Sequence, residues 1–438
     1  MLFRKIQSEI EDYLNNPGNK ILLVDGARQV GKTYIIRDSG KKLFANYIEI
    51  NMAEDEIGNR RFMNVHSVDD FYFQLSVVAG NLMNSREDTL VFLDEIQVYP
   101  HLLTLLKFLR EDNRFTYIAS GSLLGVTLSE TSSIPIGSIS VKRMYQLDFE
   151  EFLRANGYGA DALNVIKKKY EANESLDEST HKNLLEVFRR YLLVGGMPDA
   201  VNSYIAEKNI VKVRNIQKEI HSFYAADASK YDRARRLKIR HIYDMVPSYM
   251  ENKKKRVVIK DIDNVKGKTF KNYEDEFDYL LSSGITLGVK AVSTPVYPLV
   301  ENSTKNLIKL YLNDVGILTS VLYPANVDPI LTDIASINLG SVYECVVASE
   351  LKAHDHELYY YDNKKNGEVD FLTNDDANLK VLPIEVKSGK NYSTHHALDT
   401  FLADGKYPVD MGIVLSNERE IKVEGKVKYC PIYDVMYI

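Results

Sequence analysis

One stretch of eight residues near the N-terminus constrains the fold of this chain more than any other feature. The pattern G-x-x-x-x-G-K-[ST] is matched without a mismatch by Gly26-Ala27-Arg28-Gln29-Val30-Gly31-Lys32-Thr33. An apolar run at residues 21–24 precedes it and predicts a buried strand, and a helical pattern follows it. Glycines at these positions let backbone N–H groups wrap phosphate oxygens, and the N-terminus of the following helix favours an anion. The sequence therefore predicts a phosphate-binding loop between a strand and a helix.

Short apolar runs alternate with helical patterns throughout the first 125 residues. They lie at residues 20–24, 44–50, 90–93 and 115–119, and a helix is expected near residues 101–110. Strands that alternate with helices are typical of a parallel sheet covered by helices. We therefore expect an α/β fold with a parallel sheet in this part of the chain.

The residues around the loop suit a nucleoside triphosphate bound with Mg²⁺. We expect the whole loop to bind ATP, with Lys32 holding the β- and γ-phosphates and Thr33 holding the Mg²⁺ ion. Four apolar residues, LVFL, end in Asp94 and Glu95, so a buried strand places both carboxylates at its carboxyl edge. Asp94 then supports Mg²⁺, and Glu95 orients or deprotonates the attacking water. Ser120 ends the next strand, where it either senses the γ-phosphate or belongs to a plain serine-rich turn.

A second group of acids, with a lysine, lies toward the C-terminus. Glu385 and Lys387 alternate on an expected strand, so both side chains face one side of it. Asp370 lies on an earlier strand, and Glu344 lies on a helix that begins near residue 341. Carboxylates bind hard cations through oxygen, and a lysine beside them positions or helps to activate water. We predict a Mg²⁺ site for phosphodiester chemistry, with Glu344, Asp370 and Glu385 as metal ligands; the alternative is a structural charge cluster on a solvated sheet edge.

The middle of the chain is basic although the chain as a whole is acidic. Residues 205–275 hold 18 Lys and Arg against 10 Asp and Glu, a local balance of +8 within a net charge of −6. Helical patterns dominate residues 181–290, and a helix near residues 272–282 is followed by two short extended segments. This order resembles a winged helix, in which Lys and Arg contact DNA phosphates. The alternative is a helical face whose charges are solvated.

Cysteine content and hydropathy bear on the compartment. The chain has two cysteines, Cys345 and Cys430, too few for a disulfide framework. The first ten residues lack the pattern of a signal peptide, and no window approaches 18 uncharged apolar residues. We therefore expect a cytoplasmic protein in a reducing compartment, with no membrane partner.

These segments together resemble a family of prokaryotic ATPases. Its members combine an AAA-like P-loop domain, a winged-helix linker and a C-terminal domain of unknown function with a restriction-endonuclease-like core. The resemblance covers nearly the whole chain and is carried by residues 26–33, 90–97, 119–122, 148–153, 191–198, 309–316, 340–350, 368–372 and 383–389. It implies three domains, at residues 1–160, 181–300 and 301–438, which agrees with the number expected for 438 residues. It also implies that Asp370, Glu385 and Lys387 occupy the nuclease-like motif positions, with Glu344 as the helix acid.

Two functions remain open at this point. The first is an ATPase that uses ATP and Mg²⁺ and is coupled to DNA binding or processing through the nuclease-like C-terminal domain. The second is a nucleotide-gated signalling switch that binds another protein and uses the C-terminal domain as a docking module that does not cleave. The sequence decides neither the nuclease activity nor the number of subunits.

Overall fold

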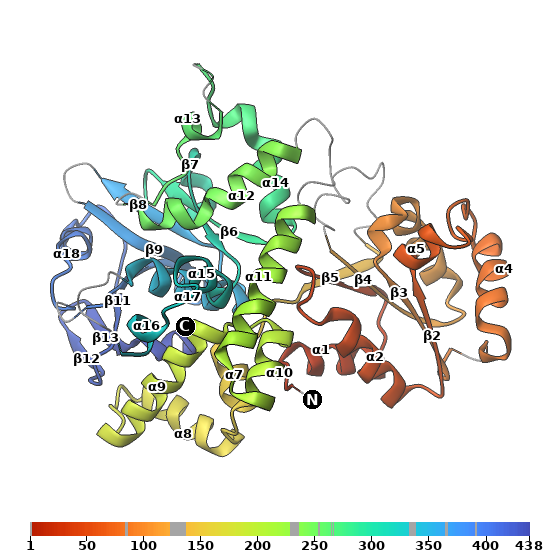
Figure 1. Cartoon of the computed structure of the whole chain (residues 1–438), viewed down its shortest axis with the longest axis horizontal. Coiled ribbons are helices and arrows are strands. Elements are labelled where there is room, and N and C mark those ends of the chain that lie inside the picture. The colour runs from red at the N-terminus through yellow and green to blue at the C-terminus, as the bar shows by residue number, and fades with distance from the viewer. Residues whose placement is uncertain are drawn as a thin grey trace. The chain divides into compact units, whose positions relative to one another are not determined.

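The chain divides into two compact units. A computed structural model describes residues 2–83, 86–122, 137–227, 236–252, 255–263, 265, 267–332, 339–363, 367–389 and 392–438, without the side chains of residues 236 and 304–306. The first unit comprises Met1–Tyr145 and Ser282–Gly284, and the second comprises Gln146–Leu281 and Ile285–Ile438. Figure 1 shows both and labels their helices and strands where there is room. The finer division into three domains stays a prediction.

The first unit is built on a five-stranded sheet whose paired strands are all parallel. The strand order is β2-β3-β4-β1-β5. The strands are β1 (Ile21–Asp25), β2 (Asn46–Asn51), β3 (Thr89–Asp94), β4 (Thr116–Gly121) and β5 (Ile139–Arg143). The three central strands β3, β4 and β1 are buried along their whole length, as expected where helices cover both faces of a parallel sheet. The predicted parallel α/β sheet is confirmed.

Helices connect these strands and supply the rest of the hydrophobic core. They are α1 (Ile6–Asn15), α2 (Lys32–Leu43), α3 (Met52–Ile57), α4 (Val68–Ala79) and α5 (Pro100–Asp112), with the 3-10 turns η1 (Gly80–Leu82) and η2 (Ile96–Val98). Ser67 caps α4 by accepting the N–H of Asp70, and Pro100 begins α5. Side chains from β3, α4 and α5 belong to one core cluster, so the sheet and these helices fold as one body.

The second unit contains a mixed sheet of eight strands. Its order is β12-β13-β11-β10-β9-β8-β6-β7, and the pairs β10–β11, β11–β13 and β6–β8 are parallel while the others are antiparallel. The strands are β6 (Thr286–Val292), β7 (Ser303–Leu312), β8 (Tyr359–Asn363), β9 (Gly367–Asp375), β10 (Lys380–Val386), β11 (Gly412–Ser416), β12 (Lys422–Glu424) and β13 (Val427–Pro431). The restriction-endonuclease-like core and the winged helix stay predictions.

The other regular elements described in the second unit are helices and 3-10 turns. The helices are α7 (Phe149–Ala155), α8 (Ala160–Glu171), α9 (Glu178–Val194), α10 (Pro198–Glu207), α11 (Ile210–Asp227), α12 (Arg236–Glu251), α13 (Ile259–Ile262), α14 (Glu274–Ser282), α15 (Val315–Leu322), α16 (Asp328–Thr332), α17 (Gly340–Ala353) and α18 (His396–Ala403). Three 3-10 turns accompany them: η3 (Phe270–Tyr273), η4 (Leu299–Asn302) and η5 (Ile432–Tyr437). Among the described residues, no helix has both the length and the apolar character needed to cross a bilayer.

A buried carboxylate accounts for two of the motifs that carry the family resemblance. Asp314 accepts the N–H of Gly196 at 2.7 Å and the N–H of Ile317 at 2.9 Å, which joins the turn between α9 and α10 to the start of α15. A Cβ at Gly196 would lie 2.0 Å from the carbonyl oxygen of Leu147, so only glycine fits there. Burial raises the pKa of Asp314 to about 6, although the N–H groups favour its charged form. These motifs fix packing within the second unit.

Candidate functional site

The phosphate-binding loop lies between β1 and α2, where the sequence predicts it. Gly26 has φ +147°, and a Cβ on it would lie 2.2 Å from the carbonyl oxygen of Met144, so the loop can turn this closely only at a glycine. Gly31, with φ +99°, is the N-cap of α2. Along the loop, Ala27 and Val30 are buried and Gln29 is exposed. The backbone path therefore depends on both motif glycines.

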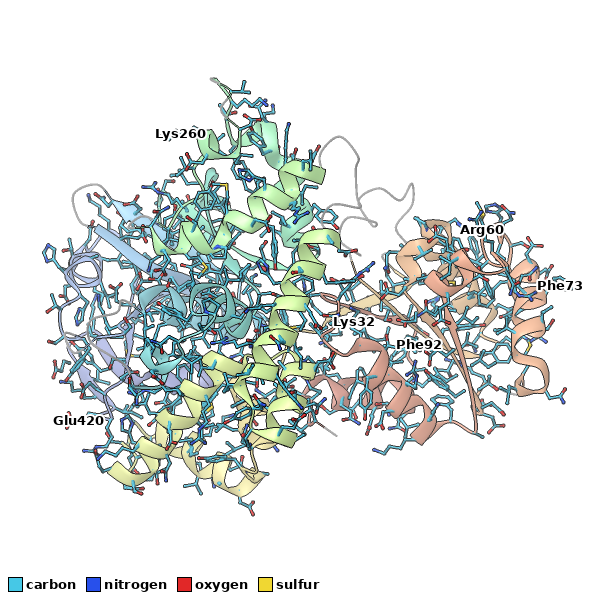
Figure 2. All side chains as sticks on the ribbon, viewed as in Figure 1. Lys32, Arg60, Phe73, Phe92, Lys260 and Glu420 are labelled. Atoms are coloured by element: carbon cyan, nitrogen blue, oxygen red, sulfur yellow. The ribbon has the colours of Figure 1, made fainter. Side chains whose placement is uncertain are left out.

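Lys32 lies inside the curve of this loop. Its Nζ atom donates to the carbonyl oxygens of Gly26 and Ala27, each at 2.8 Å, and the side chain is buried. Burial lowers the pKa of Lys32, and the carboxylates of Glu95, Asp25 and Asp94 act in the opposite direction. An ammonium group has three N–H bonds, so it retains one for a phosphate oxygen. Figure 2 marks Lys32 at the start of α2 and the core residue Phe92 on β3.

The carboxylate of Asp94 collects hydrogen bonds from three other elements at the carboxyl edge of the sheet. Thr33 Oγ1 on α2 donates to Asp94 Oδ2 at 2.9 Å, and Asn51 Nδ2 at the end of β2 donates to the same oxygen at 3.5 Å. Ser120 Oγ on β4 donates to Asp94 Oδ1. Burial raises the pKa of Asp94, while the two hydroxyl donors oppose that rise. A hydroxyl and a carboxylate at this edge are oxygen ligands of the type that Mg²⁺ prefers.

Glu95 is held in a second chain of hydrogen bonds. Its backbone is left-handed, with φ +53°, which is costly for a residue with a Cβ. Its Oε2 atom accepts from Gln97 Nε2 and, at 3.3 Å, from Ser122 Oγ. Ser122 in turn accepts from Arg28 Nε of the loop at 3.2 Å. The chain links the loop to the carboxylate that is expected to orient water.

Two of these contacts were not predicted from the sequence. Asn51 ends β2 in register with Asp94, and Gln97 follows Glu95 by two residues. A polar residue at the carboxyl end of a neighbouring parallel strand is a signal that could have identified Asn51, because such ends share one edge of the sheet. Gln97 offers no signal in spacing, since it lies in the short 3-10 turn η2 after the strand.

The structure also brings together the predicted acids of the second unit. Glu344 lies on α17, Asp370 on β9, Glu385 on β10 and Lys387 just after β10. Lys387 Nζ contacts Glu385 Oε1 at 2.8 Å, and Asp370 Oδ2 accepts the N–H of Val386 at 2.9 Å. Burial, followed by the Glu385 and Glu344 carboxylates, raises the pKa of Asp370 well above its usual value. The three acids are therefore close enough to affect one another.

Two lysines and a tyrosine that the sequence did not single out complete this cluster. Tyr311 donates its hydroxyl to Glu344 Oε2 at 2.8 Å, and Lys255 forms an ion pair with Glu344 Oε1. The fully buried Lys309 forms an ion pair with Glu368. Burial acts to raise the pKa of Glu344, but the ammonium groups of Lys255 and Lys309 hold it below its usual value.

The role of this cluster as a metal centre is not tested by the structure. Within the described ranges, no group of three or more His, Cys, Asp or Glu side chains is arranged to hold a metal ion. Both oxygens of Glu344 are already engaged, whereas Glu385 Oε2 is buried with no hydrogen-bond partner. We therefore derive no chemical step through a metal at this cluster, and its metal-binding role stays a prediction.

The basic middle segment makes several ion pairs within its own unit. Besides Lys255, Arg256 pairs with Asp362 at 3.0 Å and Lys268 pairs with Asp263 at 2.8 Å. The basic residues of this segment that lie outside the described part of the chain are Lys230, Arg233, Arg235, Lys253, Lys254 and Lys266. Part of the local positive charge thus neutralises acids of the second unit.

Three family profiles match separate parts of the chain. Residues 18–153 match the family described as AAA domain, residues 185–327 match a domain of unknown function (DUF8612), and residues 339–435 match another domain of unknown function (DUF4143). No curated protein sequence matches the chain significantly. With the parallel sheet and the loop geometry, the first match defines the first unit as an AAA-type P-loop ATPase domain, and this supports ATP binding and hydrolysis.

Several solved structures are similar to the chain at a low level. A Walker-type ATPase of Pyrococcus abyssi is 14% identical, with a TM-score of 0.45 over 74% of this chain and 96% of its own. The ORC1 protein of Aeropyrum pernix, solved in complex with DNA, is 12% identical, with a TM-score of 0.34 over 76% of this chain and 95% of its own. The Pif1 helicase of Candida albicans is 15% identical, with a TM-score of 0.24 over 38% and 48%. TM-scores and sequence identities this low support no inference about the substrate or partner of this chain.

Proposed function

We propose that the protein is a Mg²⁺-dependent ATP hydrolase whose ATP cycle is coupled to DNA binding or processing by the second unit. The observation that carries the ATPase part is the meeting of Thr33, Asp94 and Ser120 beside a loop that encloses Lys32. These side chains come from α2, β3 and β4 and converge at one edge of the sheet. Ligands of open parallel sheets bind at this edge.

Each residue of the first unit then has a distinct role. Lys32 and the backbone N–H groups of the loop bind the phosphate oxygens of ATP. Thr33 and Asp94 would hold Mg²⁺, which neutralises charge that develops on the transferred phosphoryl group. Glu95 orients the attacking water or accepts a proton from it. Ser120, on β4, senses whether the γ-phosphate is present.

Substitution of Lys32 tests the ATPase part directly. Lys32→Ala removes the charge that binds the phosphates, so we expect ATP hydrolysis to fall by about 100-fold or more. The matched control is Lys20→Ala, because Lys20 is exposed and precedes β1 in the same unit. Steady-state phosphate release with Mg²⁺ is the measurement. Equal rates for wild type and Lys32→Ala would reject the assignment of the loop.

DNA is the polyanion that we propose for the second unit. The proposal is supported by the excess of basic residues at 205–275 and by the grouping of Asp370, Glu385 and Lys387. Phosphate contacts release counterions, so binding to duplex, single-stranded or branched DNA should weaken steeply as salt increases. No binding, or binding that is independent of salt, would reject the DNA partner. Nuclease activity is assayed with Mg²⁺ or Mn²⁺, with and without ATP. Any cleavage seen with the wild-type protein should be absent in Glu385→Ala.

A nucleotide-gated switch that binds another protein is the second candidate. Two observations favour this switch: Lys387 pairs with Glu385, and both oxygens of Glu344 accept contacts. A domain whose charges are paired in this way can bind a partner without cleaving it. The discriminating variants are Asp370→Ala and Lys387→Ala. If both leave DNA binding and DNA cleavage unchanged, the switch is preferred over the DNA-processing enzyme.

A further inference from the structure

A guanidinium group from outside the loop motif contacts the backbone of the phosphate-binding loop. Arg4 lies two residues before α1, and its side chain is buried. Its Nη1 atom donates to the carbonyl oxygen of Val30 at 2.9 Å, and Val30 precedes the second glycine of the motif. Its Nη2 atom donates to the carbonyl oxygen of Tyr145, just after β5, at 2.6 Å. Arg4 therefore joins the loop to the segment after β5 within the first unit.

The contact with Tyr145 fixes the direction in which the guanidinium points. The N–H bonds of a guanidinium lie in one plane with fixed directions, so two carbonyl acceptors define its orientation. The segment that carries Tyr145 is itself held, because the Met144 N–H donates to the Asp25 carbonyl at the end of β1 at 2.7 Å. Arg4 thus approaches the Val30 carbonyl from a defined position.

This contact sets the orientation of the peptide group between Val30 and Gly31. In a trans peptide group the C=O bond and the N–H bond of the next residue point in opposite directions. Because the Val30 carbonyl is directed at Arg4, the Gly31 N–H is directed away from Arg4. Gly31 is the N-cap of α2, and anions bind to the N–H groups at the start of a helix.

Glycine at position 31 also permits the opposite orientation of this peptide group. A flip of the peptide plane changes φ at Gly31, and glycine adopts positive and negative φ with similar ease. The flipped group would present a carbonyl oxygen to the phosphates in place of an N–H donor. It would also take the Val30 carbonyl away from its charged donor, and loss of such a donor is costly in a buried place. The bond to Arg4 thus favours the orientation that suits an anion.

We infer that Arg4 is a positioning residue of the ATP site, which binds the Val30 carbonyl and thereby keeps the Gly31 N–H directed at the phosphates of the nucleotide. This inference rests on the proposed ATPase function of the first unit. The role of Arg4 differs from that of Lys32, which is expected to contact the phosphates with its own side chain. Arg4 acts through the backbone of the loop.

Steady-state ATP hydrolysis by Arg4→Met, with Mg²⁺, is the first test. Methionine keeps an apolar side chain of similar length but has no N–H donor. A phosphate contact made both before and during the reaction contributes to binding alone, so KM should rise about tenfold or more while kcat changes less than about twofold. The dissociation constant for ADP, measured by calorimetry, should rise by a similar factor.

Arg110→Met is the matched control. Arg110 Nη1 also donates to a backbone carbonyl of the first unit, that of Asn19 before β1, at 2.6 Å. The substitution therefore removes the same type of bond at a place outside the loop, and KM and the ADP affinity should equal those of wild type.

The amide proton of Gly31 provides the second test, in protein labelled with ¹⁵N-glycine. In wild type its NMR resonance should move downfield when ADP and Mg²⁺ are added, because the N–H forms a charge-assisted bond to a phosphate oxygen. This measurement does not depend on how a variant folds. In Arg4→Met saturated with ADP the displacement should be less than about half of that in wild type, whereas Arg110→Met should show the full displacement.

The outcomes separate the role of Arg4 from the proposed function. An unchanged KM in Arg4→Met overturns the positioning role, and so does a fall in kcat alone, which a smaller folded fraction would produce. A Gly31 resonance that stays in place while wild type binds ADP also overturns it. If wild type binds nucleotide without hydrolysing it, the ATPase proposal fails, and the ADP affinity and the Gly31 resonance decide the role of Arg4. If wild type binds no nucleotide, both fail.

Discussion

Gly26→Ala tests whether the backbone path of the phosphate-binding loop is fixed by sterics. The added Cβ would lie 2.2 Å from the carbonyl oxygen of Met144, and the nearest three atoms all belong to the Met144 backbone. The Met144 N–H donates to the Asp25 carbonyl at 2.7 Å, so the same two chain segments are tied together at this point. Relief of the contact requires a shift of roughly 1 Å, which stretches that bond beyond hydrogen-bonding distance.

The cost follows from two contributions. Loss of the hydrogen bond accounts for about 0.5–1.5 kcal/mol. A φ of +147° in a residue with a Cβ adds about 1–3 kcal/mol, and together they give about 1.5–4.5 kcal/mol. If the loop has to recover its path to bind ATP, the affinity falls by roughly 10-fold to 1,500-fold, since about 1.4 kcal/mol is a factor of ten.

Titration with a fluorescent ATP analogue measures this loss, and Gly18→Ala is the matched control. Gly18 lies in the turn before β1, and nothing lies within 4 Å of a Cβ placed on it. Its affinity should equal that of wild type. The reasoning is refuted if Gly26→Ala binds the analogue as tightly as Gly18→Ala does.

Three further predictions concern the donor Gln97, the carboxylate of Asp314 and the two cysteines. Gln97→Ala removes one of the two donors to Glu95 Oε2, so kcat for ATP should fall by about 10-fold with KM nearly unchanged. A rise in KM at constant kcat in steady-state assays would contradict this role. Because burial raises the pKa of Asp314 from 3.8 to about 6, the folded state holds this proton more tightly than the unfolded state. Wild type should therefore lose up to about 3 kcal/mol relative to Asp314→Asn as pH rises from about 3 to about 7, measured by urea unfolding, and a difference independent of pH would refute the shift. Burial raises the pKa of Cys345 and brings that of Cys430 to about 12. A thiol reagent at pH 8 should therefore label neither cysteine in the folded protein and both after unfolding. Labelling of the folded protein would show that the reagent reaches these thiols without unfolding.

The first unit was the part of the fold most accessible from the sequence. The loop motif specifies its own strand and helix context, and buried parallel strands appear as continuous apolar runs such as LVFL before Asp94. Both signals are local, so spacing along the chain was enough to predict the parallel sheet and to expect Thr33 and Asp94 at one edge.

The second unit depends on contacts that spacing cannot reveal. β6 and β7 belong to the same sheet as β8 to β13, although α15, α16 and α17 separate them in the chain. Lys255 lies 89 residues from Glu344, and in the sequence it belongs to a run of four basic residues that favours a nucleic-acid surface. Only the fold shows that Lys255 and Arg256 pair with acids. Local charge counts cannot distinguish a solvated basic face from an internal counter-charge.

The shared carboxylate of Asp94 has a consequence for sequence variation. Because one side chain accepts hydrogen bonds from Thr33, Asn51 and Ser120, a change at any of these positions alters the environment of the other two. Substitutions at residues that share a partner do not add in free energy. Which substitutions each position tolerates in a mutational scan will therefore depend on the residues already present at the other two. A harmful substitution at one of these three positions should be compensated by changes at the other two.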